Sequence, residues 1–208
     1  MEEKKISEQE SLELITRMIN QTKKDLSVGN GDSFLMWGYL SAAISLAVIV
    51  MLLATNDPRF AWLYMVIPIA GFTASGIKTY KAKRKSHVAS TYASNTINNV
   101  WAIISAVFAV YAIGCLLHFG EVRSWNGMFL LGMLLPGIGT YTTGVILKEK
   151  SIQMCGLLGV VIGTGLLRDF VCGEQVISIM QMGQMVLSFV ITLIIPGHIL
   201  NFKAKKQQ

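Results

Sequence analysis

The sequence predicts an all-α membrane protein, a polytopic bundle of six transmembrane helices arranged as three hairpins and preceded by an N-terminal amphipathic helix. Six stretches contain no Asp, Glu, Lys or Arg, and most reach the roughly 20 helical residues that cross a bilayer. Charged residues make up only 14% of the 208 residues, against roughly 25% in soluble domains. The six stretches are Phe34–Leu53, Phe60–Ile77, Val100–Phe119, Trp125–Leu147, Ile152–Leu167 and Val176–Leu200.

The placement of positive charge predicts the orientation of these spans. With six crossings, fifteen of the 18 Lys and Arg fall on one side, and the other side holds only Arg59, Arg123 and Arg168. Because Lys and Arg are retained on the cytoplasmic side of spans, we expect a cytoplasmic (inner) membrane protein with both termini in the cytoplasm. The net charge of +6 is then a topology signal. We therefore expect the lipid bilayer as a partner and no nucleic acid.

Three segments follow from this layout: residues 1–33 as a cytoplasmic amphipathic helix and a break, 34–200 as the six-helix transmembrane domain, and 201–208 as a basic cytoplasmic tail. In the first segment, Ser7-Glu8-Gln9-Glu10 fits a capping box, and Gly29-Asn30-Gly31 is expected to end the helix. Its apolar stripe consists of Leu12, Ile15, Ile19 and Leu26. Residues 7–27 are either an interfacial helix on the inner leaflet or a docking helix for a cytoplasmic protein or a second copy.

The first two hairpins look like repeats of one unit. A Pro, a Gly and a second Gly recur in the second and fourth spans at a constant offset of 68 residues. These residues, which also suit close helix packing, are Pro68, Gly71 and Gly76, then Pro136, Gly139 and Gly144. Trp37 and Trp101 match in the first and third spans, at an offset of 64. We predict a parallel repeat about an axis along the membrane normal, with a divergent third hairpin.

Polar residues recur along one face of the sixth span: Gln181, Gln184, Ser188 and Thr192. Thr140 and Thr143 of the fourth span offer a facing surface. Unpaired polar groups in hydrocarbon cost several kcal/mol, so this face must turn inward. Its side chains either form hydrogen bonds between helices or line a polar cavity.

Two further groups are candidates for function or packing. His118, Glu121, Arg168 and Asp169 lie at similar depth near the outer face, either as membrane anchors or as an outer vestibule. The fifth span carries Gly156, Gly159 and Gly163, which indicate a close-packed face within the monomer or in a dimer.

No ionisable residue lies in the middle of a span, which argues against proton-coupled, metal-dependent and voltage-sensing mechanisms. The three Cys share no metal-ligand spacing, and we expect no cofactor. The first expectation for function is therefore a non-enzymatic membrane protein that acts through protein or lipid interaction. The alternative is a small-solute carrier or channel with a path lined by the last span, and an intramembrane enzyme is a distant third.

The chain has a distinctive outline, which consists of an N-terminal amphipathic helix, a short break and then Phe34-x-x-Trp37-Gly38 at the start of the first span. In this outline the chain resembles uncharacterised small bacterial membrane proteins with six spans. The resemblance implies a fold and no activity, and it assigns no functional residue.

Overall fold

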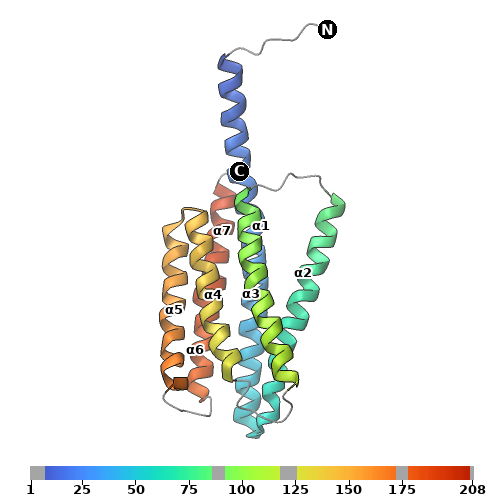
Figure 1. Cartoon of the computed structure of the whole chain (residues 1–208), viewed down its shortest axis with the longest axis vertical. Coiled ribbons are helices and arrows are strands. Elements are labelled where there is room, and N and C mark those ends of the chain that lie inside the picture. The colour runs from blue at the N-terminus through green and yellow to red at the C-terminus, as the bar shows by residue number, and fades with distance from the viewer. Residues whose placement is uncertain (1–7, 86–91, 118–125, 172–177, 207–208) are drawn as a thin grey trace.

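The computed structural model describes residues 8–85, 92–117, 126–171 and 178–206, and every regular element in these ranges is a helix (Figure 1). This confirms the predicted all-α class. The helices are α1 (Glu8–Thr55), the 3₁₀ helix η1 (Pro58–Met65), α2 (Val66–Lys85), α3 (Tyr92–Leu117), α4 (Asn126–Ile146), α5 (Lys150–Val171), α6 (Ile179–Phe189), the π-helical segment η3 (Val190–Ile194) and α7 (Ile195–Lys206).

Among the described residues, four helices are long and apolar enough to cross a membrane. They are Gly31–Thr55, Tyr92–Cys115, Gly127–Ile146 and Ile179–Lys206. The last of these joins α6, η3 and α7 without interruption. The remaining two stretches predicted as spans, Phe60–Ile77 and Ile152–Leu167, are helical as well, within η1–α2 and α5.

The helix break predicted at Gly29-Asn30-Gly31 is wrong, because α1 runs from Glu8 to Thr55 without interruption. The glycine serves packing instead. A Cβ at Gly31 would lie 2.0 Å from Asn201 Oδ1 and 3.0 Å from the carbonyl oxygen of Gly197, so Gly31 allows α7 to approach closely. The N-terminal part of α1 extends beyond the other helices (Figure 1). Of the predicted apolar stripe, Leu12 is exposed, and the side chains of its other members lie outside the described residues.

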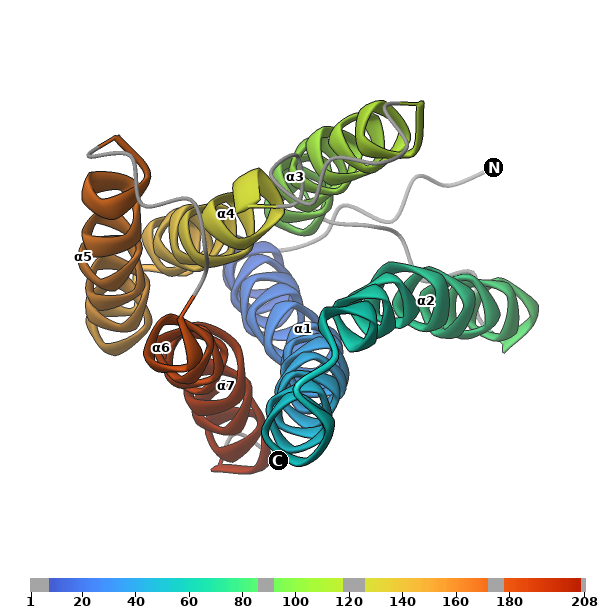
Figure 2. The ribbon, with the colours of Figure 1, turned by 90° about the horizontal axis from the view of Figure 1, so that it is seen from below.

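Seen along the bundle, α1 lies between α2 and the α6–α7 helix, and α4 lies between α3 and α5 (Figure 2). The helix α2 packs mainly on α1 and η1, and α3 packs mainly on α4. On this side of the molecule α2 and α3 diverge from each other (Figure 2). The opposite side, where α4, α5 and α6–α7 meet, has the most extensive helix contacts.

Glycines explain the tight contact between α4 and α5. A Cβ at Gly156 would lie 2.3 Å from the backbone nitrogen of Tyr141, and one at Gly144 would lie 2.6 Å from that of Gln153. A Cβ at Gly163 would lie 2.7 Å from the side chain of Leu134 and 3.3 Å from its backbone nitrogen. Backbone therefore meets backbone along this interface, as small residues permit in membrane helices.

Basic residues gather at one end of the bundle, where α2 ends, α3 begins and α4 turns into α5 (Figure 1). They include Lys78, Lys81, Lys148, Lys150, Lys203, Lys205 and Lys206. The opposite end carries Arg59 in η1 and Arg168 near the end of α5.

Candidate functional site

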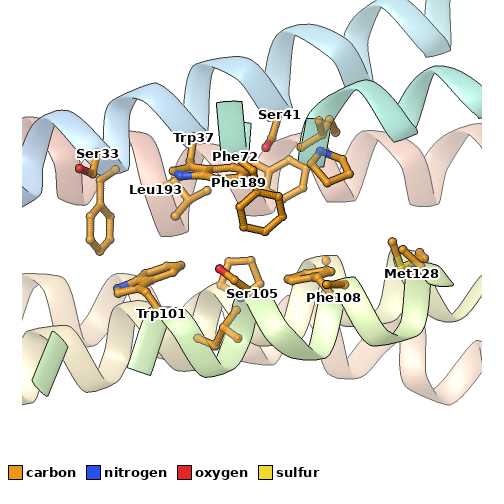
Figure 3. A pocket seen from close by; sticks show the side chains of 18 of the residues that line it. Ser33, Trp37, Ser41, Phe72, Trp101, Ser105, Phe108, Met128, Phe189 and Leu193 are labelled. Atoms are coloured by element: carbon orange, nitrogen blue, oxygen red, sulfur yellow. The ribbon is translucent and has the colours of Figure 1, made fainter. Parts of the chain in front are cut away.

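An elongated cavity of about 280 Å³ lies between α1, η1, α2, α3 and α4, and the last helix closes it with Met185, Phe189 and Leu193 (Figure 3). Its volume is close to the lower end of the range for small-ligand sites, roughly 300–1,000 Å³. Along α3 its lining extends from Ile97 to Ala112, about 22 Å at 1.5 Å per residue. Most lining side chains are apolar, and eight are aromatic: Phe34, Trp37, Tyr64, Phe72, Trp101, Phe108, Phe129 and Phe189.

Edge-to-face aromatic pairs brace the walls of the cavity. The ring centroids of Phe34 and Trp101 are 5.1 Å apart, joining α1 to α3. Two further pairs, Trp37–Phe72 at 5.5 Å and Tyr64–Phe129 at 4.9 Å, join α1 to α2 and η1 to α4. Such pairs contribute about 0.5–1.5 kcal/mol each beyond their buried area. The rings therefore hold the helices at a separation that leaves the cavity open.

Two tryptophans on the cavity wall each lie against a glycine of the following helix. A Cβ at Gly71 would lie 2.1 Å from Cζ3 of Trp37, and one at Gly139 would lie 3.1 Å from Cη2 of Trp101. Pro68 and Pro136, about one turn earlier, both line the cavity. The Trp and Pro residues matched between the two hairpins thus line one cavity.

One end of the cavity is polar and lies at the basic end of the bundle. Ser33 and Asn98 line it there, and Lys78 Nζ donates to Ser33 Oγ at 3.0 Å. Asp32, the neighbour of Ser33 on α1, faces α7 instead, where its carboxylate accepts a hydrogen bond from Asn201 at 2.8 Å. The ammonium of Lys78 is therefore held beside this end of the cavity by a direct hydrogen bond.

The predicted polar face of the last span lies outside this cavity. Gln181 and Ser178 form a capping box at the start of α6: Ser178 N donates to Gln181 Oε1 at 2.8 Å, and Gln181 N donates to Ser178 Oγ at 3.3 Å. Gln184 is half-buried, and Ser188 is fully buried with no hydrogen-bond partner for its hydroxyl among the described residues. Capping accounts for the position of Gln181 without a polar path.

The buried threonines bind carbonyl groups between and within helices. Thr140 Oγ1 on α4 donates to the carbonyl oxygen of Thr192 at 2.6 Å, and Thr192 Oγ1 donates to that of Ser188 at 2.7 Å. Thr192 lies in the π-helical segment, where Ile195 N donates to the carbonyl oxygen of Val190, five residues earlier, and Pro196 has no N–H to continue this pattern. Thr140 therefore supplies, from another helix, a donor to a carbonyl where the regular backbone hydrogen bonding is interrupted.

Thr143 plays a related part beside the cavity. Its hydroxyl donates to the carbonyl oxygen of Gly139 at 2.7 Å and accepts a hydrogen bond from Trp101 Nε1 at 3.1 Å. This bond fixes the indole that forms part of the cavity wall. The contacts of Thr140 and Thr143 are of the kind that the hydrogen-bonding alternative predicts.

The remaining predicted positions fall into two groups. His118 and Glu121 lie outside the described residues, and of Arg168 and Asp169 only the helical backbone within α5 is described. The predicted packing glycines make close contacts within the chain, with Gly159 against Thr192 of the last helix. At Gly76, by contrast, a Cβ would meet nothing within 4 Å in the part of the chain that the structure describes.

Within the described ranges, no group of three His, Cys, Asp or Glu is placed to hold a metal ion. Cys115 is buried and Cys155 half-buried, and neither of these two described cysteines forms a disulfide. The cavity therefore provides apolar contacts along its length. At one end it provides hydrogen-bonding groups and the positive charge of Lys78.

No protein-family model, curated protein or solved structure matches this chain.

Sequence reasoning did not identify the cavity, although it singled out some of its residues. Trp37, Trp101, Pro68 and Pro136 stand out because they match between hairpins, and all four line the site. The signal present in the sequence was this coincidence of bulky aromatic and helix-distorting residues at equivalent depths. Ser33, Lys78 and Asn98 gave no signal, because their meeting depends on how three helices lie together.

Proposed function

We propose that this chain is a non-enzymatic protein of the cytoplasmic membrane, with six spans, that binds one apolar chain of a lipid in the cavity between its first two hairpins. The observation that carries the proposal is an elongated, aromatic-lined cavity among membrane-type helices. Lipid acyl chains are the most abundant molecules of matching shape and polarity in that environment.

Packing, more than hydrophobicity, drives such binding. Lipid tails are as apolar as the cavity wall, so transfer from the bilayer gains little from the hydrophobic effect. An empty cavity, however, deprives its lining of dispersion contacts, and a chain that fills it restores them. Rings held by edge-to-face pairs present a preformed surface, which lowers the ordering cost of binding.

The count of six spans rests on the helicity of η1–α2 and α5, which run alongside the four apolar helices (Figure 1). The gathering of basic residues at one end of the bundle supports a cytoplasmic location for that end. The equivalent contacts of Trp37 with Gly71 and of Trp101 with Gly139 support an origin of the two hairpins by duplication.

A carrier is the second candidate, and one observation favours it: Pro68 and Pro136 of the two matched hairpins face one cavity. Substrate sites of many transporters lie between repeats near the middle of the membrane. In that case a solute or lipid would cross the membrane in vesicles containing the protein. Replacement of Gln181 and Gln184 by Leu would reduce flux only if the last helix lines the path.

The protruding part of α1 supports a separate proposal, that residues 7–27 dock a cytoplasmic protein or a second copy. Deletion of residues 1–28 is then expected to leave a stable membrane protein that loses its co-purifying partner or its self-association. An unchanged set of partners would contradict this role.

The lipid-binding proposal is tested by filling the cavity from α3. Ala109 lines it, whereas Ala106, three residues earlier on the same helix, is exposed on another face. Native mass spectrometry of the detergent-purified chain is expected to show one retained lipid in the wild type and in Ala106→Phe. Ala109→Phe is expected to retain none. Equal retention by both variants would contradict the proposal.

A further inference from the structure

We infer that the lipid held in the cavity carries an anionic phosphate headgroup, bound by Lys78 beside Ser33 and Asn98. This inference rests on the proposed function, because it names the class of lipid that the same site takes. It adds the polar end of the cavity to the apolar part already described.

The position of Lys78 makes it suitable for a headgroup. Ser33 marks one end of the cavity and Met128 the other (Figure 3). Lys78 donates to Ser33 at that first end, so a chain lying along the cavity brings its headgroup to the ammonium. An ammonium has three N–H donors, and Ser33 accepts one of them. Phosphate oxygens can accept the others while the acyl chain stays among the aromatic rings.

The charges around this end favour an anion. Lys81 follows Lys78 on α2, and further lysines lie at the ends of α4, α5 and α7. The described carboxylates at this end are engaged elsewhere: Asp32 accepts from Asn201, and Glu149 pairs with Lys203. A zwitterionic headgroup would bring its own cation to the same place and lose part of the attraction.

A lipid headgroup, and not a free phosphate ion, is the source of the anion that the geometry favours. The polar end is continuous with an apolar cavity about 22 Å long on α3. A free ion would leave that volume unfilled, whereas an anionic phospholipid occupies both parts. Asn98, which lines the same end, offers an amide to the glycerol esters or the phosphate.

The cavity contains its own fluorescent reporters, Trp37 and Trp101. In a full-length chain with Trp62→Phe and Trp125→Phe, these two tryptophans dominate the emission. The protein is reconstituted in phosphatidylcholine vesicles containing a minor fraction of lipid with brominated acyl chains, which quench tryptophan on contact. The brominated lipid is phosphatidylglycerol in one series and phosphatidylcholine in the other.

We expect brominated phosphatidylglycerol to reach half-maximal quenching at a mole fraction about fivefold lower than brominated phosphatidylcholine, since one Lys near a membrane surface contributes about 1 kcal/mol. Lys78→Gln is expected to remove this preference and Lys81→Gln, the matched control, to keep most of it. Ser33→Ala is expected to weaken it less than Lys78→Gln. A large excess of inorganic phosphate is expected to leave it unchanged.

The outcomes distinguish a failure of the headgroup inference from a failure of the proposed function. Equal quenching by both lipids, or a preference that survives Lys78→Gln, overturns the headgroup inference and leaves the cavity's binding of a chain intact. Loss of the preference in inorganic phosphate overturns the lipid as source and assigns the site to a free anion. If Ala109→Phe changes quenching by neither lipid, the proposed function itself fails.

Discussion

Glycines on the two sides of this bundle face different groups of the neighbouring helix. Between α4 and α5, Gly156 and Gly144 face backbone atoms of the neighbouring helix, so the helices meet without a gap. In the first two hairpins, Gly71 and Gly139 face the rings of Trp37 and Trp101, and a cavity remains beside those rings. A glycine in a span therefore does not fix the distance between helices. The group opposite the glycine does.

The largest effect is expected where backbone faces backbone. Gly156→Leu places a Cβ 2.3 Å from the nitrogen of Tyr141, which cannot move without shifting α4. We expect a loss of about 3 kcal/mol or more in the free energy of unfolding, at the upper end of overpacking costs. Unfolding of the purified protein by SDS in mixed micelles measures it.

Gly165→Leu on the same helix is the control, because a Cβ at that position would meet none of the described residues within 4 Å. It is expected to unfold close to the wild type. Similar losses in the two variants would mean that α5 tolerates no added side chain anywhere. The distinction between backbone-facing and open glycines would then fail.

A smaller loss is expected from removal of the hydrogen bond that Thr140 donates to the π-helical segment before Pro196. Thr140→Val removes the hydroxyl that donates to the carbonyl of Thr192 and keeps the volume of the side chain nearly unchanged. Hydrogen bonds between membrane helices contribute about 0.6–1.7 kcal/mol, and we expect a value at the upper end because the carbonyl is left without that donor. The same SDS titration applies.

Thr142→Val provides the comparison within α4, because the Thr142 hydroxyl donates to carbonyls of its own helix, those of Ile138 and Gly139, and to no other group among the described residues. Its expected effect is close to zero. A loss as large as that of Thr140→Val would show that the interhelical bond has no special weight.

The helices of this chain could be predicted largely from apolar runs without charge, since that pattern is imposed by the bilayer itself. The prediction failed at Gly29-Asn30-Gly31, where helix-breaking residues continue α1. Glycine costs about 1 kcal/mol in a helix relative to alanine, and the close contact of Gly31 with α7 outweighs that cost. The π-helical turn at 190–194 was not predicted either, although Pro196 lies two residues after its end.

The site was less predictable than the fold. Matching prolines and tryptophans showed which positions are equivalent, but a cavity exists only where helices diverge, and periodicity carries no information on divergence. Ser33 and Lys78 are 45 positions apart, and their contact depends on the angle between α1 and α2. For the polar face of the last span, the sequence allowed two interpretations, hydrogen bonding between helices and the lining of a cavity. In the structure, the facing residue Thr140 donates a hydrogen bond to the backbone carbonyl of Thr192 in the last span.

The smallest expected effect compares the two tryptophans directly. Trp101 Nε1 donates to Thr143, whereas among the described residues no hydrogen bond joins Trp37 to Ser75, the position that corresponds to Thr143. Trp101→Phe and Trp37→Phe each shorten an aromatic side chain against a glycine. We expect Trp101→Phe to cost about 0.6 kcal/mol more, the average for one such bond in a membrane. Thr143→Val should lower stability by a similar amount and add nothing to Trp101→Phe, because both remove the same bond. If the two Trp variants lose equal stability, ring packing alone holds both hairpins, and the hydrogen bond of Trp101 contributes nothing that Trp37 lacks.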